Sequence, residues 1–155
     1  DENKMKKLYP LLSVLFLIYW GCEEEDLIIE KEKFESLQFA KEKWKTKNIT
    51  SYTINLSVNC FCLPYQPIVI KVDDDIIAEI NGDSVTQFQL ENDYWYANTV
   101  DDLFLFIEQS LAQEPYQKIL LFNSSYGYPE EIFFDFEEMV ADEEIGYIIT
   151  SFKID

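Results

Sequence analysis

The chain has 155 residues, enough for one domain with short extensions, and its 48% apolar and 16% aromatic residues are ample for a packed core. Its 12 basic residues are all lysine and stand against 30 acidic residues, which gives a formal net charge of −18 without any histidine. This charge excludes nucleic acid as an expected partner, because phosphate backbones are bound through cationic contacts that release counterions.

The first residues predict a secretion signal. Lys6 and Lys7 follow Met5 as a short positive region, and Leu8–Trp20 is a run of 13 almost wholly apolar residues. A run of this length suits the apolar region of a signal peptide, and it is too short to span the roughly 30 Å hydrocarbon core of a bilayer.

The apolar run stops at Gly21-Cys22. At this point the chain resembles a bacterial lipoprotein signal, in which the cysteine is lipidated and becomes the mature N-terminus. We therefore expect residues 1–22 to form a signal segment that ends at the lipidated Cys22, with an ordinary cleaved signal or an uncleaved anchor as the alternatives. Lipidation would make the membrane a partner through the anchor, because two or more acyl chains hold a protein stably at a bilayer surface.

The acidic residues after Cys22 predict a tether over residues 23–33, and residues 34–155 are expected to form a single domain. A first helix is predicted from about Lys31 to Lys47. Its buried face is indicated by apolar residues that recur every three or four positions, namely Phe34, Leu37, Ala40 and Trp44.

Alternation of apolar and polar residues predicts the strands that follow. The first covers Tyr52–Asn59, a second opens after Pro67, and Ile76–Asn81 returns from a turn at Asp73-Asp74-Asp75. Another turn at Asn81-Gly82-Asp83 leads to a fourth short strand over Val85–Leu90. The side chains expected to face the core in the first two strands are Tyr52, Ile54, Leu56, Val58, Ile68, Ile70 and Val72.

A second helix is predicted to begin after Thr99, because Asp102 stands three residues further on as a capping-box partner. Its buried stripe is expected to consist of Val100, Leu103, Phe104, Ile107 and Leu111. Three more strands are predicted, over Tyr116–Phe122, Ile132–Phe136 and Ile145–Ile154.

Strands joined by short turns pair antiparallel. We therefore predict an α+β domain with a single antiparallel sheet of about six strands and two helices packed on one face. The repeated order of one helix and three strands further suggests a tandem duplication.

Several short motifs occur in an order that resembles a known family. They are Trp44 in the first helix, SYTINLSVNCFC at 51–62, TVDDLFLFI at 99–107, LLFNSSYGYPEEIFFD at 120–135 and ADEEIGYIITSF at 141–152. In this order they resemble the bacterial lipoprotein family catalogued as domain of unknown function 6174, over about residues 34–153. The chain departs from the pattern at Phe122-Asn123, where such proteins tend to have Tyr-Asp. The family has no established activity, so the resemblance implies export and a fold rather than a reaction.

Cys60 and Cys62 stand one residue apart at the end of the first predicted strand. A structural zinc site takes four Cys or His ligands, and a reactive thiolate needs a nearby cation or helix N-terminus. Export favours a disulfide between the two, whereas the strand alternation favours a pair of buried thiols. The disulfide is the leading expectation, and buried thiols, a redox pair and a metal site are its alternatives.

Two aromatic runs are candidates for the rim of a ligand or partner site. These are Tyr94, Trp95 and Tyr96 before the second helix, and Tyr126 and Tyr128 in the motif that contains Gly127. Packing is the competing interpretation, and Gly127 and Pro129 predict a turn in the second run.

The chain lacks the residues that common catalytic sites require. Without histidine there is no Ser-His or Cys-His nucleophile, and its four glycines form no phosphate-binding loop. We therefore expect no enzyme, no cofactor and no metal. The prediction is an exported lipoprotein on the periplasmic or cell-surface side of the outer membrane that binds an envelope protein or a ligand. The alternative is a thiol–disulfide or metal-handling envelope protein that uses Cys60 and Cys62.

Overall fold

The structure is a computed structural model that describes residues 24–61, 66–140 and 142–155, with side chains from residue 36 onward within these ranges. The chain divides into two compact units, Asp1–Gln38 and Phe39–Asp155, and the second holds the sheet. In the described ranges the elements are α3 (Glu24–Lys47), β1 (Tyr52–Cys60), β2 (Ile68–Asp73), β3 (Ile76–Ile80), β4 (Asp83–Ser84), α4 (Gln87–Asn92), α5 (Val100–Leu111), β5 (Gln117–Phe122), β6 (Pro129–Asp135) and β7 (Ile145–Ile154).

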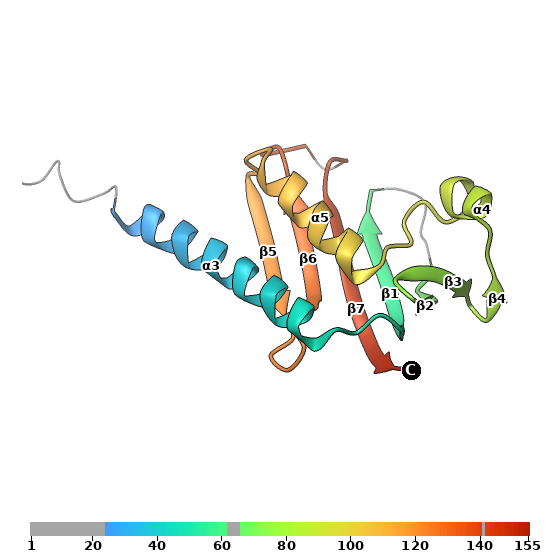
Figure 1. The fold of residues 1–155 in the computed structure, drawn as a ribbon. Helices are drawn as coiled ribbons and strands as arrows, with labels where there is room; N and C mark the ends of the chain where they lie inside the picture. The colour runs from blue at the N-terminus through green and yellow to red at the C-terminus, as the bar shows by residue number, and fades with distance from the viewer. Residues whose placement is uncertain (1–23, 62–65, 141) are drawn as a thin grey trace, which may run out of the picture. The chain divides into compact units, whose positions relative to one another are not determined.

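The described strands form one antiparallel sheet with the order β4-β3-β2-β1-β7-β6-β5 (Figure 1). This confirms the predicted α+β fold with a single antiparallel sheet. Among the described residues the sheet has seven strands and the helices number three, against about six strands and two helices predicted.

Strand β1 lies at the centre of the sheet and pairs with both β2 and β7. As the alternation predicts, Tyr52, Ile54 and Leu56 are buried, while the intervening side chains are half-buried. The register with β7 shifts between Asn55 and Leu56, and beyond this irregularity Val58 is only half-buried.

The two predicted turns of the first hairpins are confirmed by the backbone. Asp74 and Asp75 have φ of 50° and 65°, and Asn81 and Gly82 have φ of 53° and 89°. Two consecutive residues in the left-handed region form the tight turn that matches the twist of antiparallel strands, and Asp, Asn and Gly tolerate it best.

The strand predicted over Val85–Leu90 is wrong. Strand β4 has two residues and is followed by helix α4, which begins where Thr86 caps it. The Thr86 hydroxyl accepts from the Gln89 N–H, and the Gln89 side chain accepts from the Thr86 N–H at 3.0 Å. Helix α4 has no fully buried side chain among its residues, so this capping box, rather than the core, decides its conformation.

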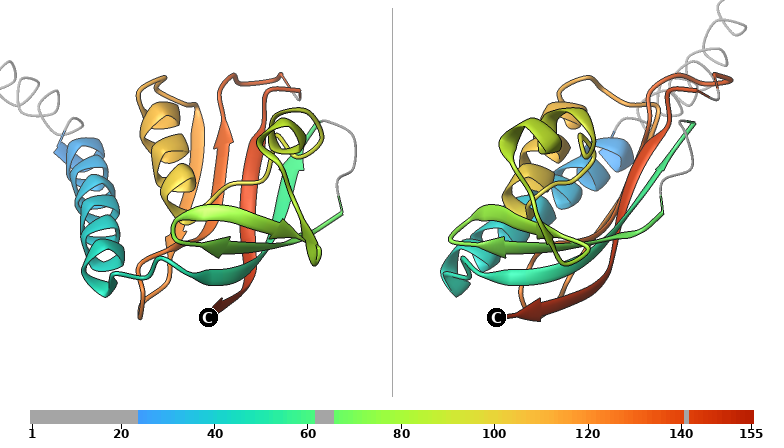
Figure 2. Two further views of the ribbon diagram at one scale, coloured as in Figure 1. Left: turned by 45° about the vertical axis from the view of Figure 1, so that its right-hand side comes forward. Right: turned by 90° about the vertical axis from the view of Figure 1, so that its right-hand side faces the viewer.

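Helix α5 lies on one face of the sheet, as do the last turns of α3 from Phe39 onward (Figures 1 and 2). Phe104 stacks on Phe122 of β5 with ring centroids 6.2 Å apart, and Phe106 meets Phe134 of β6 and Tyr147 of β7 edge-on. The predicted capping box of Thr99 and Asp102 is confirmed. The predicted buried stripe of α5 is confirmed except that Ser110 is buried and Leu111 is half-buried.

Helix α3 starts at Glu24 rather than near Lys31, so part of the segment predicted as a tether is helical. Of its predicted buried face, Leu37, Ala40 and Trp44 are buried, and the side chain of Phe34 lies outside the described residues. No described helix combines the length and the apolar character that crossing a bilayer requires.

Among the described strands, no twofold axis perpendicular to the sheet relates the two predicted halves, and the suggested tandem duplication stays a prediction. A twofold axis between the central strands β1 and β7 would relate β1 to β7 and β3 to β5. These are not corresponding strands, because β1 and β5 are the ones that follow a helix in the two halves.

Candidate functional site

The sheet face opposite α5 carries no helix of the described second unit, and we call it the open face (Figure 2). At β5, β6 and β7 its outward side chains include four large apolar ones, Ile119, Leu121, Phe133 and Ile148. Ile119 is 46% exposed, Leu121 51% and Ile148 39%. Large apolar side chains grouped on an uncovered sheet face are typical of a binding surface.

The strand register sets these side chains in two rows across the sheet. Ile119 pairs with Phe133, which pairs with Gly146, which in turn pairs with Asn59 of β1. In the next row, Leu121 pairs with Glu131, which pairs with Ile148. Directly opposite side chains on one sheet face are close neighbours, so the two rows form a largely apolar strip that also contains Glu131.

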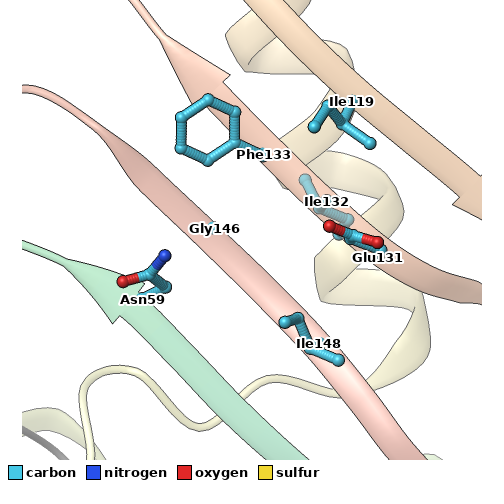
Figure 3. Close-up of a pocket in the computed structure, with 7 residues that line it drawn as sticks. All are labelled: Asn59, Ile119, Glu131, Ile132, Phe133, Gly146 and Ile148. Atoms are coloured by element: carbon cyan, nitrogen blue, oxygen red, sulfur yellow. The ribbon is translucent and has the colours of Figure 1, made fainter.

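A hollow of about 150 Å³ interrupts this strip where Gly146 lacks a side chain (Figure 3). Ile119, Phe133 and Ile148 surround it, and Asn59 and Glu131 supply polar groups at its margin. A Cβ atom at position 146 would lie 2.8 Å from the carbonyl oxygen of Ile132, so close strand packing requires glycine here. The hollow is therefore a consequence of the backbone geometry, and it is large enough for one apolar side chain.

Two side-chain oxygens with an open-face position are buried without a hydrogen-bond donor in the described part of the chain. They are Oδ1 of Asn55 on β1 and Oδ1 of Asp135 on β6. Asp135 pairs with Gln117 at the start of β5, one pair beyond Ile119 along the same face. A buried carboxylate oxygen without a donor favours a cationic or N–H donor nearby.

The first predicted aromatic run lies elsewhere, between α4 and α5. Tyr96 is buried, Trp95 is 48% exposed, and each of Tyr94 and Trp95 meets Tyr96 edge-on at 6.4 and 5.8 Å. Trp95 borders a groove of about 440 Å³ next to the β2–β3 turn. Other residues that line it are Asp75, Ile77, Leu90, Glu91 and Asp102. The carboxylate of Asp102 is already engaged in capping α5, so we consider this groove the weaker candidate.

One of the three cysteines, Cys60, lies in the described part of the chain. Cys60 ends β1, is half-buried and is disulfide-bonded, and Cys22 and Cys62 lie outside the described residues. The pairing of Cys60 with Cys62 and the lipidation of Cys22 therefore stay predictions. Within residues 24–61, 66–140 and 142–155, no group of three or more Cys, Asp or Glu side chains is arranged to hold a metal ion.

Comparison with known proteins identifies a family. The model of the family of unknown function DUF6174 matches residues 36–154. The chain belongs to the DUF6174 family. No curated protein and no solved structure matches it.

In this DUF6174 chain, residues from all five motifs that mark the resemblance meet in one place. Rings from four of them form an aromatic cluster of Trp44, Tyr52, Tyr126, Tyr128 and Phe152. Tyr128 stacks on Phe152 with centroids 4.5 Å apart, and Trp44 meets Tyr52 edge-on at 5.5 Å. The remaining motif joins through hydrogen bonds, from Trp44 Nε1 to Asp101 at 3.4 Å and from the Val100 N–H to the Tyr52 hydroxyl at 2.8 Å.

This aromatic cluster joins α3, β1, α5, β7 and the β5–β6 turn, so the motifs build the fold. The structure does not bring Tyr126 and Tyr128 together with Tyr94, Trp95 and Tyr96 in any described ring contact, and Tyr128 is buried. Burial raises the pKa of the Tyr52 hydroxyl above its ordinary range, with nearby Asp101 and Asp102 acting in the same direction. These are properties of a packed interior rather than of a catalytic acid.

Sequence reasoning did not single out Ile119, Phe133, Gly146 or Ile148. Strand β5 is apolar at four consecutive positions, Ile119 to Phe122, which is typical of a strand buried on both faces. Its position at an edge of the sheet leaves one of those faces exposed. The four consecutive apolar residues were visible in the sequence, but they indicate an exposed apolar face only once the strand order shows that β5 lies at an edge.

Proposed function

We propose that this DUF6174 chain is a non-catalytic binding protein of the bacterial cell envelope that holds a partner on its open face at β5–β7. A lipid on Cys22 anchors it to the membrane, with the folded unit on the periplasmic or cell-surface side. The observation that carries the binding role is the apolar strip around the hollow at Gly146, where Ile119, Leu121 and Ile148 are each between 39% and 51% exposed. With 30 acidic and 12 basic residues, the chain has many charged side chains for its surface, so a group of exposed apolar side chains on one face calls for an explanation such as binding.

The binding role can be tested by crosslinking in the native host. A photoreactive residue at position 148, within the strip, should give one recurrent adduct with an envelope component. The matched control is the same residue at Val69, which is 41% exposed on β2 and lies away from the strip. Equal adducts from both positions, or none from position 148, would contradict binding at this face.

The anchor has its own test, because Cys22 is the only residue of the signal segment that can carry the lipid. Cys22→Ala in the full chain should release the protein from the membrane fraction. Continued retention of the Cys22→Ala variant would show that another segment anchors it. The absence of catalysis is tested by a broad hydrolase and reductase screen of the purified chain, in which turnover would contradict the proposal.

A further inference from the structure

The sheet ends in two edges of different construction. Strand β4 has two residues, both polar, and gives way at once to α4, and the register between β2 and β3 shifts beside it. Strand β5 has six residues without proline and pairs, in the described part of the chain, with β6 alone. Its register with β6 is regular from Gln117 to Leu121 and shifts only before Phe122, the last residue of the strand. Short strands, irregular pairing and proline are the usual means of blocking an edge from further strands. They protect the β4 edge, whereas β5 presents a row of backbone N–H and C=O groups along its outer side.

The side chains of β5 favour addition of another strand. Ile119 and Leu121 point to the open face, where they begin the two rows that continue through Phe133 and through Glu131 and Ile148. Tyr116, just before the strand, is 52% exposed. A strand placed beside β5 would set alternate side chains on the same face, next to Ile119 and Leu121, and so extend both rows.

Carboxylates of β6 and of the segment after it lie beside both ends of β5, and Lys118 is the one basic residue of the strand. At the start of β5, Asp135 pairs with Gln117, and Glu138 accepts from the Tyr116 hydroxyl at 3.1 Å. At its end, Glu131 pairs with Leu121, and Glu130 accepts from the Asn123 side chain at 2.8 Å. Complementary charge directs association, so these groups favour a basic partner and disfavour a second copy of a chain that carries −18.

We propose that β5 receives an extended segment of a partner protein as an additional antiparallel or parallel strand, with apolar side chains beside Ile119 and Leu121 and lysine or arginine residues at its ends. The main chain of the segment pairs with β5 and supplies binding, while the apolar strip and the flanking carboxylates select its sequence. This inference rests on the proposed binding function and specifies the partner's chemistry.

The test uses the full chain and a fluorescein-labelled peptide, Lys-Lys-Val-Thr-Val-Thr-Val-Lys-Lys, followed by fluorescence anisotropy at low salt. A second peptide of the same charge carries proline in place of the central valine. Proline removes a backbone donor and disrupts strand pairing, so the second peptide should bind about tenfold more weakly or worse. Equal binding of the two peptides would show charge attraction alone and would overturn the proposal.

Variants locate the site. Ile119→Lys should weaken binding of the first peptide about tenfold, because it removes an apolar contact and repels the flanking lysines. Leu121→Lys serves as a second variant with the same expectation if Ile119→Lys folds poorly. Val69→Lys makes the matched change on β2 of the open face and should alter binding by no more than about twofold, since β1, β7 and β6 separate it from β5.

Amide hydrogen exchange distinguishes strand pairing from charge attraction, because charge attraction alone would not slow the exchange of the β5 backbone amides. Bound peptide should slow exchange over residues 117–122. Protection confined to the groove at Trp95, or none on β5, would overturn strand addition. A dimer in sedimentation that Ile119→Lys dissociates would assign the edge to a second copy and also overturn it. If position 148 crosslinks in the host while the peptide test fails, the strand proposal falls and the binding function stands.

Discussion

Tyr52 shows how a single side chain can hold several elements in place. Its hydroxyl accepts from the Val100 N–H at 2.8 Å, and its ring lies 5.5 and 5.6 Å from those of Trp44 and Phe152. Val100 is the first residue of α5, and an N–H in the first turn of a helix has no acceptor within the helix. Tyr52 therefore satisfies a buried donor that α5 cannot satisfy itself.

Tyr52→Phe should lower the free energy of unfolding by about 1–3 kcal/mol, the usual cost of leaving a buried donor without its partner. The effect is measured by urea denaturation at neutral pH. Tyr116→Phe is the control, because Tyr116 is exposed and donates to Glu138 at the surface, so its loss should change stability by less than about 0.5 kcal/mol. Equal effects of the two substitutions would contradict the role given to Tyr52.

The pH dependence of the same site has a defined sign. Because burial raises the pKa of the folded Tyr52 hydroxyl, the neutral form is favoured in the fold, and this contribution is fully present below the unfolded pKa of about 10. Stability should therefore fall as the pH rises above about 10, where tyrosine ionises in the unfolded chain. The free energy of unfolding of Tyr52→Phe should decrease less steeply with pH than that of the wild type, as measured by denaturation curves from neutral to alkaline pH. Burial also raises the pKa of Tyr128 and Tyr147, so the slope should decrease without vanishing.

At the scale of elements, sequence patterns predict strands and helices well where one face is buried and the other is not. Strands β1 and β7 have the predicted bounds to within a residue, and helix α5 begins at the predicted Thr99 cap, because core side chains fix their phase. The pattern fails at α4, which has no fully buried side chain and owes its conformation to the Thr86 capping box.

The candidate site could not be predicted in the same way, because it depends on which strands are neighbours. The hollow combines Ile119, Phe133, Gly146 and Asn59 from four strands, and their alignment follows from the register of β5, β6, β7 and β1. No local pattern shows that β5 is an edge strand. The aromatic residues predicted as a rim were conspicuous in the sequence, yet two of them, Tyr96 and Tyr128, are buried.

The turn between β5 and β6 offers a test of how elements are joined. Gly127 has a φ of 89°, and a Cβ atom there would lie 2.4 Å from the Ala40 carbonyl oxygen of α3. Gly127→Ala should therefore lower the free energy of unfolding through two contributions, about 1–2 kcal/mol for the left-handed backbone and about 1–3 kcal/mol for the clash. Chemical denaturation measures the total.

Gly82 provides the matched control, because it has the same φ of 89° but a Cβ atom would meet nothing within 4 Å. Gly82→Ala should show the backbone contribution alone, about 1–2 kcal/mol. If the two variants are equally destabilised, the close approach of the turn to α3 contributes nothing, and the role of the Gly127 motif in joining these elements is refuted.

At the scale of the whole molecule, charge opposes folding. The chain has 30 acidic residues and 12 basic ones, and the described ion pairs include Lys41–Glu108, Lys71–Glu79 and Lys153–Asp155, all at least partly exposed. Exposed pairs contribute little, typically about 0–1 kcal/mol each, so repulsion among the surplus carboxylates should dominate the long-range electrostatics of the fold.

Added salt should therefore stabilise this protein. Raising NaCl from about 0.02 M to about 0.5 M shortens the screening length to a few ångströms and should raise Tm by a few degrees in calorimetry. A fall in Tm would mean that the local ion pairs outweigh the surplus charge. The same salt should weaken binding of a basic strand at β5, because it screens Asp135, Glu131 and their neighbours. Salt should thus raise the stability of the fold while it weakens peptide binding, so weaker binding at high salt cannot be attributed to unfolding. The loss of affinity would instead measure the electrostatic contribution to binding.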